Sequence, residues 1–105
     1  MAFALGGAPA GARARTGREF PTPPAWWQRQ AACIAEAESH SQVHDRANAT
    51  YRGKWQFDRT TWASVGGAGD PADAGEPEQD YRAFRLWQRR GWQPWPSTAR
   101  GCGLR

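Results

Sequence analysis

The sequence predicts a small domain of the α+β class, mainly α, with one short β-hairpin. A chain of 105 residues has room for one domain with one modest core. Two segments carry apolar residues at helical spacing, and a short stretch between them alternates with the period of a strand. The mean hydropathy is -0.85, and the apolar runs are far shorter than the roughly 18 residues of a membrane span, so we expect no membrane insertion.

The N-terminal segment differs in composition from the rest of the chain. Residues 1–22 are rich in Ala, Gly and Arg and carry almost no large apolar side chains. Because no helical or strand period appears there, we expect residues 1–22 to form a flexible N-terminal leader. Residues 23–105 are expected to form the folded domain.

The first helix is expected from about Pro23 to His40. The hydroxyl of Thr22 can cap it, and prolines are tolerated in a first helical turn because their missing N–H needs no partner there. Residues at steps of four, three and four along this segment share one face. They are Trp27, Ala31, Ile34 and Glu38. Glu38 is therefore expected at the end of an apolar stripe.

The middle of the chain contains the strand signal and a second helix. Residues 51–57 place Tyr, Gly, Trp and Phe at every second position, which predicts the short hairpin. A second helix is expected over residues 58–65, because a pair of glycines follows it. The turn-rich residues 66–75 are expected to form a loop.

A third helix is expected over about residues 76–90. Three acids and Pro77 lie near its start and two arginines lie at its end, as the helix dipole favours. Its apolar side consists of Tyr81, Phe84 and Trp87. Residues 91–96 are expected to form a rigid aromatic turn that leads to Cys102.

Charge and aromatic content narrow the classes of partner. The net charge is +4, which favours an acidic partner and leaves nucleic acid, anionic lipid and acidic cell-wall polymer open. Seven tryptophans are more than a core of this size hides easily, so we expect some indoles to line a groove. Those on helical stripes, Trp27, Trp62 and Trp87, are expected in the core.

Glu38 is the candidate for acid–base chemistry. A carboxylate on an apolar helix face is costly to ionise, so such a site favours the protonated form that a general acid needs. A Glu held in an apolar pocket protonates a glycosidic oxygen in lysozyme. The alternative that stays open is that Glu38 turns to solvent. The nearest other acids, Asp45 and Asp58, lack a nucleophile motif and are expected in a loop or a helix cap.

The cysteines and histidines give no metal signal. Cys33 and Cys102 belong to no Cys-x-x-Cys or Cys/His cluster, and His40 and His44 lack a third ligand. No metal and no cofactor are therefore predicted. The sequence leaves open whether the two cysteines are bridged or are unrelated buried thiols. A bridge would imply an exported protein.

Several short motifs follow one another with compatible gaps. In chain order they are Cys33-Ile34, Glu38-Ser39, Tyr51-x-Gly53-x-x-Gln56-Phe57, Thr60-Thr61-Trp62, Gly66-Gly67, Gly91-Trp92-x-x-Trp95-Pro96 and Cys102. Together they resemble the transglycosylase-like family, which includes the resuscitation-promoting factors of actinobacteria. The resemblance covers about residues 25–105 and assigns residues 23–105 to a transglycosylase-like catalytic domain.

The resemblance implies a small lysozyme-like fold that acts on peptidoglycan. It makes Glu38 the single catalytic acid and pairs Cys33 with Cys102 in a disulfide. The expected substrate-binding residues are Thr61, Gln56, Tyr51, Trp55, Trp92 and Trp95, where the aromatic rings offer flat apolar faces to sugars. The family's Glu-Ser-Gly-Gly-Asn reads Glu38-Ser39-His40-Ser41-Gln42 here, a change that concerns the shape of the cleft more than the acid.

With the resemblance, the predicted function is cleavage of the β-1,4 bond between N-acetylmuramic acid and N-acetylglucosamine. The enzyme is expected to be a lytic transglycosylase or a hydrolase, to act as a monomer on peptidoglycan strands, and to be secreted, extracellular or cell-wall associated. One alternative is a wall-glycan-binding module without catalysis, because the glycine pair after Ser39 is missing. The other, a small basic nucleic-acid binder using Arg82, Arg85, Arg89 and Arg90, leaves Glu38 and the cysteines unexplained.

Overall fold

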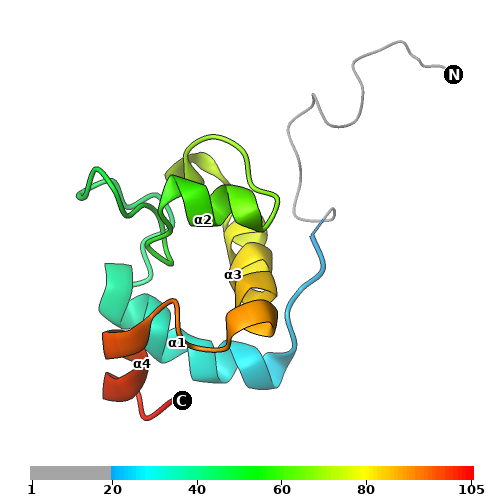
Figure 1. Ribbon diagram of the computed structural model, residues 1–105, viewed down its shortest axis with the longest axis vertical. Helices are drawn as coiled ribbons and strands as arrows, with labels where there is room; N and C mark the ends of the chain where they lie inside the picture. Colours follow the sequence, from blue (N-terminus) through cyan, green and yellow to red (C-terminus); the bar gives the residue numbers. More distant parts are fainter. Residues whose placement is uncertain (1–19) are drawn as a thin grey trace, which may run out of the picture.

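The computed structural model describes residues 20–105, so most of the expected leader at residues 1–22 lies outside the described residues. The described part is mainly helical (Figure 1). Its elements are α1 (Ala25–Ser39), α2 (Arg59–Ser64), the short 3-10 helix η3 (Pro71–Asp73), α3 (Glu76–Arg90) and α4 (Pro96–Gly101).

Helix α1 forms within two residues of the predicted bounds. It begins after Pro24, and Gln28 supports this start by donating its backbone N–H to the Pro24 carbonyl and its side-chain amide to the Pro23 carbonyl. The cap expected from Thr22 is not used, because Pro24 takes the N-cap position. The helix ends at Ser39, and the C-cap residue His40 has a φ of 56°. Trp27, Ala31 and Ile34 are buried along one face, as predicted.

The expected hairpin is reduced to a tight turn. Within residues 20–105 the only β pairing is one isolated antiparallel bridge between Arg52 and Phe57. Gly53 sits inside the turn with a φ of 80°, and a Cβ there would lie 2.5 Å from the side-chain oxygen of Gln79. The alternation in the sequence arises because Gly53, Trp55 and Phe57 are buried while Tyr51 is exposed. The two-residue period over residues 51–57 therefore arises from alternating burial of side chains and not from pairing of two strands.

Helices α2 and α3 form where the sequence predicts them. Asp58 caps α2 by accepting the backbone N–H of Thr61 at 2.7 Å. Arg82 of α3 is buried and donates to the carbonyl of Val65 at 2.6 Å and to Glu78 at 2.7 Å. The bond to Val65 attaches α3 to the C-terminal end of α2, whereas the bond to Glu78 lies within α3. Figure 1 shows α2 lying across the start of α3.

The core is a cluster of aromatic rings. Five of the seven tryptophans are buried, so most of the indoles pack in the core instead of lying at the surface. The five are Trp27, Trp55, Trp62, Trp92 and Trp95. Trp27 lies at the centre, parallel to Trp92 at 6.1 Å and edge-on to Phe84 at 5.3 Å. Indoles can hide in a small core because they pack on one another.

Helix α4 was not predicted, and it is held beside α1 (Figure 1). It begins at Pro96, directly after the aromatic turn, and buries Ala99. The disulfide between Cys33 of α1 and Cys102, which follows α4, confirms the expected pairing with a Cα–Cα distance of 6.0 Å. None of the helices over residues 20–105 combines the length and apolar character of a membrane span.

Candidate active site

A groove of about 260 Å³ runs past the C-terminal end of α1. We call it the Glu38 groove. It is lined by Glu38, Tyr51, Gln56, Pro94, Trp95, Pro96, Ser97 and Thr98. Three parts of the chain meet there, namely the last turn of α1, the turn around residues 51–57 and the start of α4. The groove therefore exists only when segments distant in the sequence are folded together.

Glu38 is half-buried in the last turn of α1. Its Oε2 accepts a hydrogen bond of 2.6 Å from the hydroxyl of Thr98, and no cationic group pairs with it among residues 20–105. Prolines and Trp95 line the same groove. Glu38 thus lies beside a groove with apolar walls, and its only hydrogen-bond partner in the described chain is a neutral hydroxyl.

Ser39 fixes the end of α1 to the neighbouring turn. Its side chain is buried, and its hydroxyl lies 2.8 Å from the carbonyl of Lys54 and 3.3 Å from that of Ala35. The Lys54 carbonyl belongs to the turn that carries Gln56. The Glu-Ser pair therefore places an acid in the groove and anchors the backbone that forms the groove's other wall.

The two residues after Ser39 have positive φ values, although neither of them is glycine. His40 and Ser41 have φ values of 56° and 60°, the left-handed region that side chains other than glycine adopt at a cost. These are the positions where the related motif has two glycines. The backbone at these two positions therefore has the conformation that glycine adopts most easily, and it carries two side chains there.

Gln56 and Tyr51 form the wall opposite α4. Gln56 has a φ of 55°, which costs on the order of 1 kcal/mol for a non-glycine residue and occurs most often at functional sites. Its side-chain amide donates to the Gly53 carbonyl at 2.9 Å, which closes the turn. Tyr51 is 49% exposed and is one of two large exposed hydrophobic residues over residues 20–105.

The structure brings together four of the predicted site residues and separates three others from them. Glu38, Tyr51, Gln56 and Trp95 line the groove. Trp55 and Trp92 do not line it, because both are buried in the aromatic core, although Trp95 donates its indole N–H to the Trp55 carbonyl at 3.0 Å. Thr61 also lies outside the groove lining and donates its hydroxyl to Asp58 at 3.1 Å.

Thr98 and Ser97 line the groove and were missed because α4 was not predicted. One signal could have found Thr98. The implied Cys33–Cys102 bridge holds α1 against the segment before Cys102. A residue about one turn after Cys33 then lies near a residue about one turn before Cys102, which brings Glu38 and Thr98 together.

The other polar candidates have local structural roles. Asp58 caps α2, and Asp45 accepts the backbone N–H of Ala47 at 2.9 Å within its own loop, as expected. His40 lies 3.3 Å from Glu36, whereas His44 lies 2.7 Å from the Ala72 carbonyl. The two imidazoles thus have different partners.

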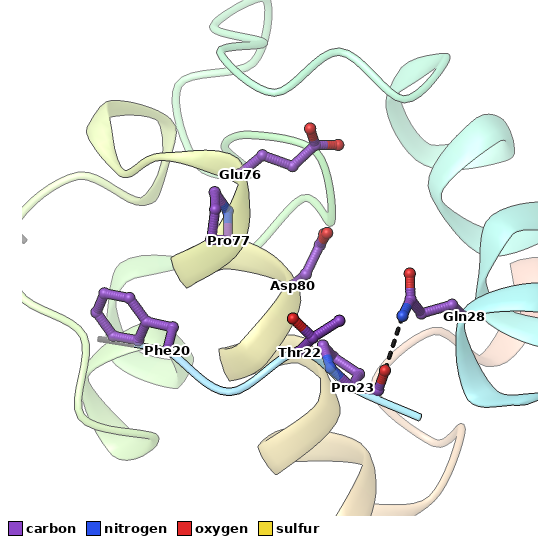
Figure 2. Close-up of a pocket in the computed structure, with 7 residues that line it drawn as sticks. All are labelled: Phe20, Thr22, Pro23, Gln28, Glu76, Pro77 and Asp80. Atoms are coloured by element: carbon purple, nitrogen blue, oxygen red, sulfur yellow. Dashed lines mark hydrogen bonds between the residues drawn. The ribbon is translucent and has the colours of Figure 1, made fainter. Parts of the chain in front are cut away.

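A second hollow, which we call the acidic pocket, also has carboxylates in its wall (Figure 2). Its volume is about 190 Å³. It is lined by Phe20, Thr22, Pro23, Gln28, Glu76, Pro77 and Asp80. Figure 2 shows Glu76, Pro77 and Asp80 along α3, with Gln28 of α1 opposite.

The two acids of the acidic pocket are already paired. Lys54 Nζ lies 2.7 Å from Glu76 and 3.0 Å from Asp80, which also accepts the indole N–H of Trp55 at 3.0 Å. Burial lowers the pKa of Lys54, but the hydrogen bonds to Glu76 and Asp80 outweigh it and leave the pKa raised. These carboxylates serve an ion pair, so they are poor candidates for proton donation.

A family profile and two known proteins that resemble this chain all indicate the same family. Residues 25–98 match the profile of the transglycosylase-like domain. The resuscitation-promoting factor Rpf of Micrococcus luteus is 35% identical over 78 residues, which cover 74% of this chain and 33% of the relative. Resuscitation-promoting factor RpfC of Mycobacterium tuberculosis is 35% identical over 72 residues, which cover 68% of this chain and 51% of the relative. The chain thus spans between a third and a half of the length of these relatives.

Proposed function

Because this chain belongs to the transglycosylase-like family, we propose that it cleaves peptidoglycan, with Glu38 as its general acid. The bond cleaved is the β-1,4 linkage between N-acetylmuramic acid and N-acetylglucosamine. The observation that carries this proposal is the position of Glu38, which lines a groove at a helix end without a cationic partner in the described chain. A carboxyl group that faces a groove is within reach of a ligand bound there and can act on it as a general acid.

In the first step the O–H bond of protonated Glu38 breaks and its proton passes to the glycosidic oxygen. The bond between that oxygen and the anomeric carbon then breaks, and its electron pair stays with the leaving oxygen. Glu38 is left as a carboxylate beside a sugar with oxocarbenium character. The apolar wall supplied by Pro94, Trp95 and Pro96 limits the water that would compete for the proton before a sugar binds.

In the second step the Glu38 carboxylate acts as the base. It removes a proton from an oxygen nucleophile, which forms the new bond to the anomeric carbon and returns the acid to its protonated state. We propose the sugar's own 6-hydroxyl as that nucleophile, which gives a 1,6-anhydro product. Glu38 is the one carboxylate in the groove lining, so this route needs no second acid. Water as nucleophile gives the hydrolytic product instead.

Tyr51, Gln56 and Trp95 are proposed to hold the sugar. The exposed Tyr51 ring offers a flat face to sugar C–H groups, and the Gln56 amide offers polar groups at the groove wall. Trp55 and Trp92, packed behind Trp95, support its orientation from the core. Thr61 is proposed to support the site through the Asp58 cap at the start of α2.

The location is proposed to be the cell wall, reached by secretion, where the protein acts as a monomer. A net charge of +4 favours association with anionic wall polymers. The Cys33–Cys102 disulfide agrees with an oxidising environment outside the cytoplasm.

The test is digestion of purified peptidoglycan with the wild type and Glu38→Gln, followed by mass spectrometry of the soluble products. Glu38→Gln is isosteric but its amide has no acidic proton to transfer, so the rate should fall by at least about 100-fold. The matched control is Glu76→Gln in the acidic pocket, which should cleave within about twofold of the wild type.

The products separate the alternatives. Fragments lighter than hydrolytic ones by one water indicate the anhydro route. Equal cleavage by Glu38→Gln and the wild type refutes the catalytic assignment. Binding of wild-type protein to peptidoglycan without any cleavage identifies a non-catalytic wall-binding module.

A further inference from the structure

The hydroxyl of Thr98 makes the one hydrogen bond from the described chain to the Glu38 carboxylate, at 2.6 Å from Oε2. The two residues are 60 positions apart and belong to different helices. Their contact therefore depends on how α4 is fixed against α1. Thr98 is not among the residues that the sequence motifs mark.

Thr98 is held on both sides by the backbone of α4. The following residue, Ala99, is buried and donates its N–H to the Trp95 carbonyl at 2.7 Å. The Thr98 carbonyl accepts the N–H of Cys102 at 3.0 Å, and Cys102 is bonded to Cys33 of α1. The disulfide that ties the helices together thus lies one turn from the hydroxyl that contacts the acid.

This hydrogen bond makes the two carboxyl oxygens of Glu38 unequal. A carboxyl group is a rotor with two oxygens of similar basicity, and a proton can reside on either. Because Oε2 accepts the Thr98 hydroxyl while Oε1 accepts no hydrogen bond from residues 20–105, the proton of the acid form is favoured on Oε1. The bond also fixes the rotation of the carboxyl plane relative to the groove.

We propose that Thr98 is the positioning residue of the active site, which orients the Glu38 carboxyl group so that Oε1 carries the transferred proton. This inference rests on the proposed function. The chemistry needs one oxygen of the acid within hydrogen-bond reach of the glycosidic oxygen, and a misplacement of about 1 Å can cost on the order of 100-fold in rate. Thr98 lines the groove, but the proton does not pass through it.

The test compares Thr98→Val, Thr98→Ser and a matched Thr60→Val control, with soluble glycan strands as substrate. Thr98→Val keeps the shape and removes the donor, so kcat should fall by about 10- to 100-fold with KM changed by less than about threefold. Thr98→Ser keeps the hydroxyl, so kcat should return to within about threefold of the wild type. Thr60 is exposed on α2, and its variant should match the wild type.

The kinetics and stability of the variants distinguish the possible outcomes. Loss of kcat in Thr98→Val with rescue in Thr98→Ser, at equal thermal stability, supports the positioning role. Wild-type kcat in Thr98→Val overturns it, and so does a loss that appears only in KM. Equal loss in both Thr98 variants also overturns it, because the hydroxyl is then not the active group. If the wild type cleaves nothing, the proposed function itself fails, a result distinct from all of these.

Discussion

The Glu38 groove and the acidic pocket both present carboxylates to a hollow of similar size, and they differ in the partner of the acid. In the acidic pocket the ammonium group of Lys54 lies within 3.0 Å of two carboxylates. In the groove a neutral hydroxyl contacts a lone carboxyl group. An ammonium group stabilises the charged form of an acid, whereas a hydroxyl accommodates either form. A carboxylate in a cleft is therefore informative only together with its partner.

The largest expected effect is a loss of folding stability when the disulfide that holds α4 beside α1, and so helps to form the Glu38 groove, is removed. The Cys33–Cys102 bridge closes 69 positions of chain, so Cys33→Ser with Cys102→Ser should lower the free energy of unfolding by about 4 kcal/mol. Chemical denaturation of the oxidised wild type and the double variant measures this. An unchanged unfolding midpoint would show that α4 is held by packing alone.

A smaller effect is expected from moving the acid without removing it. Glu38→Asp shortens the side chain by one methylene and withdraws the carboxyl group from both Thr98 and the groove, so cleavage should slow by about 100-fold. Glu76→Asp, the same change in the acidic pocket, should leave the rate within about twofold. Comparable rates for Glu38→Asp and the wild type would contradict the requirement for a fixed acid.

In the acidic pocket, changing the Lys54–Asp80 ion pair is expected to lower stability and to leave cleavage unchanged. Asp80→Asn removes a charge that both Lys54 Nζ and the Trp55 indole contact, so the free energy of unfolding should fall by about 1.5 kcal/mol. Cleavage by the folded variant should stay within about twofold of the wild type. A large loss of kcat at temperatures where Asp80→Asn is fully folded would mean that the two hollows are coupled.

The smallest expected effect concerns acid stability. The hydrogen bond from Arg52 lowers the pKa of Asp70 to about 2, against the opposing effect of burial. A lowered pKa contributes stability above the unfolded value of about 4, and that contribution is lost as the pH falls from about 4 toward 2. Because solvent still reaches both side chains, which are 13% and 16% exposed, screening limits the loss to about 1 kcal/mol. Asp70→Asn should flatten the pH dependence of unfolding in this window, and an identical acid profile would argue against the ion pair.

The long elements could be predicted from the sequence, and the short ones could not. Helix α3 occupies residues 76–90 as expected, because the acids at its start and the arginines at its end agree with the helix dipole. Its predicted apolar side, Tyr81, Phe84 and Trp87, is only partly buried, and the buried face carries Gln79, Arg82, Ala83 and Leu86. Helix α4 has six residues, too few for a periodic pattern, and it begins at a proline inside an aromatic turn. The segment 51–57 has the alternation of a strand, but Gly53 and Gln56 at positive φ fold it into a turn.

The residues of the candidate site also fall into those that local sequence patterns predict and those that depend on tertiary contacts. Glu38 was identified because it ends the apolar stripe of a long helix, and Gln56 and Tyr51 because they belong to a motif. Thr98 was not identified, because its importance depends on a tertiary contact between α1 and α4. The number of tryptophans does not predict which of them bind sugar, because composition does not show that Trp55 and Trp92 pack against other rings.

The nearly parallel rings of Trp27 and Trp92, at an interplanar angle of 6°, also have an optical consequence. Indoles fixed in a packed core contribute to the near-ultraviolet circular dichroism of a protein, and this signal should disappear when the packing is lost on unfolding. Trp95 lies 6.3 Å from Trp92 and also lines the groove. Occupancy of the groove by a saccharide should therefore perturb this built-in chromophore, and binding could be followed without any attached label.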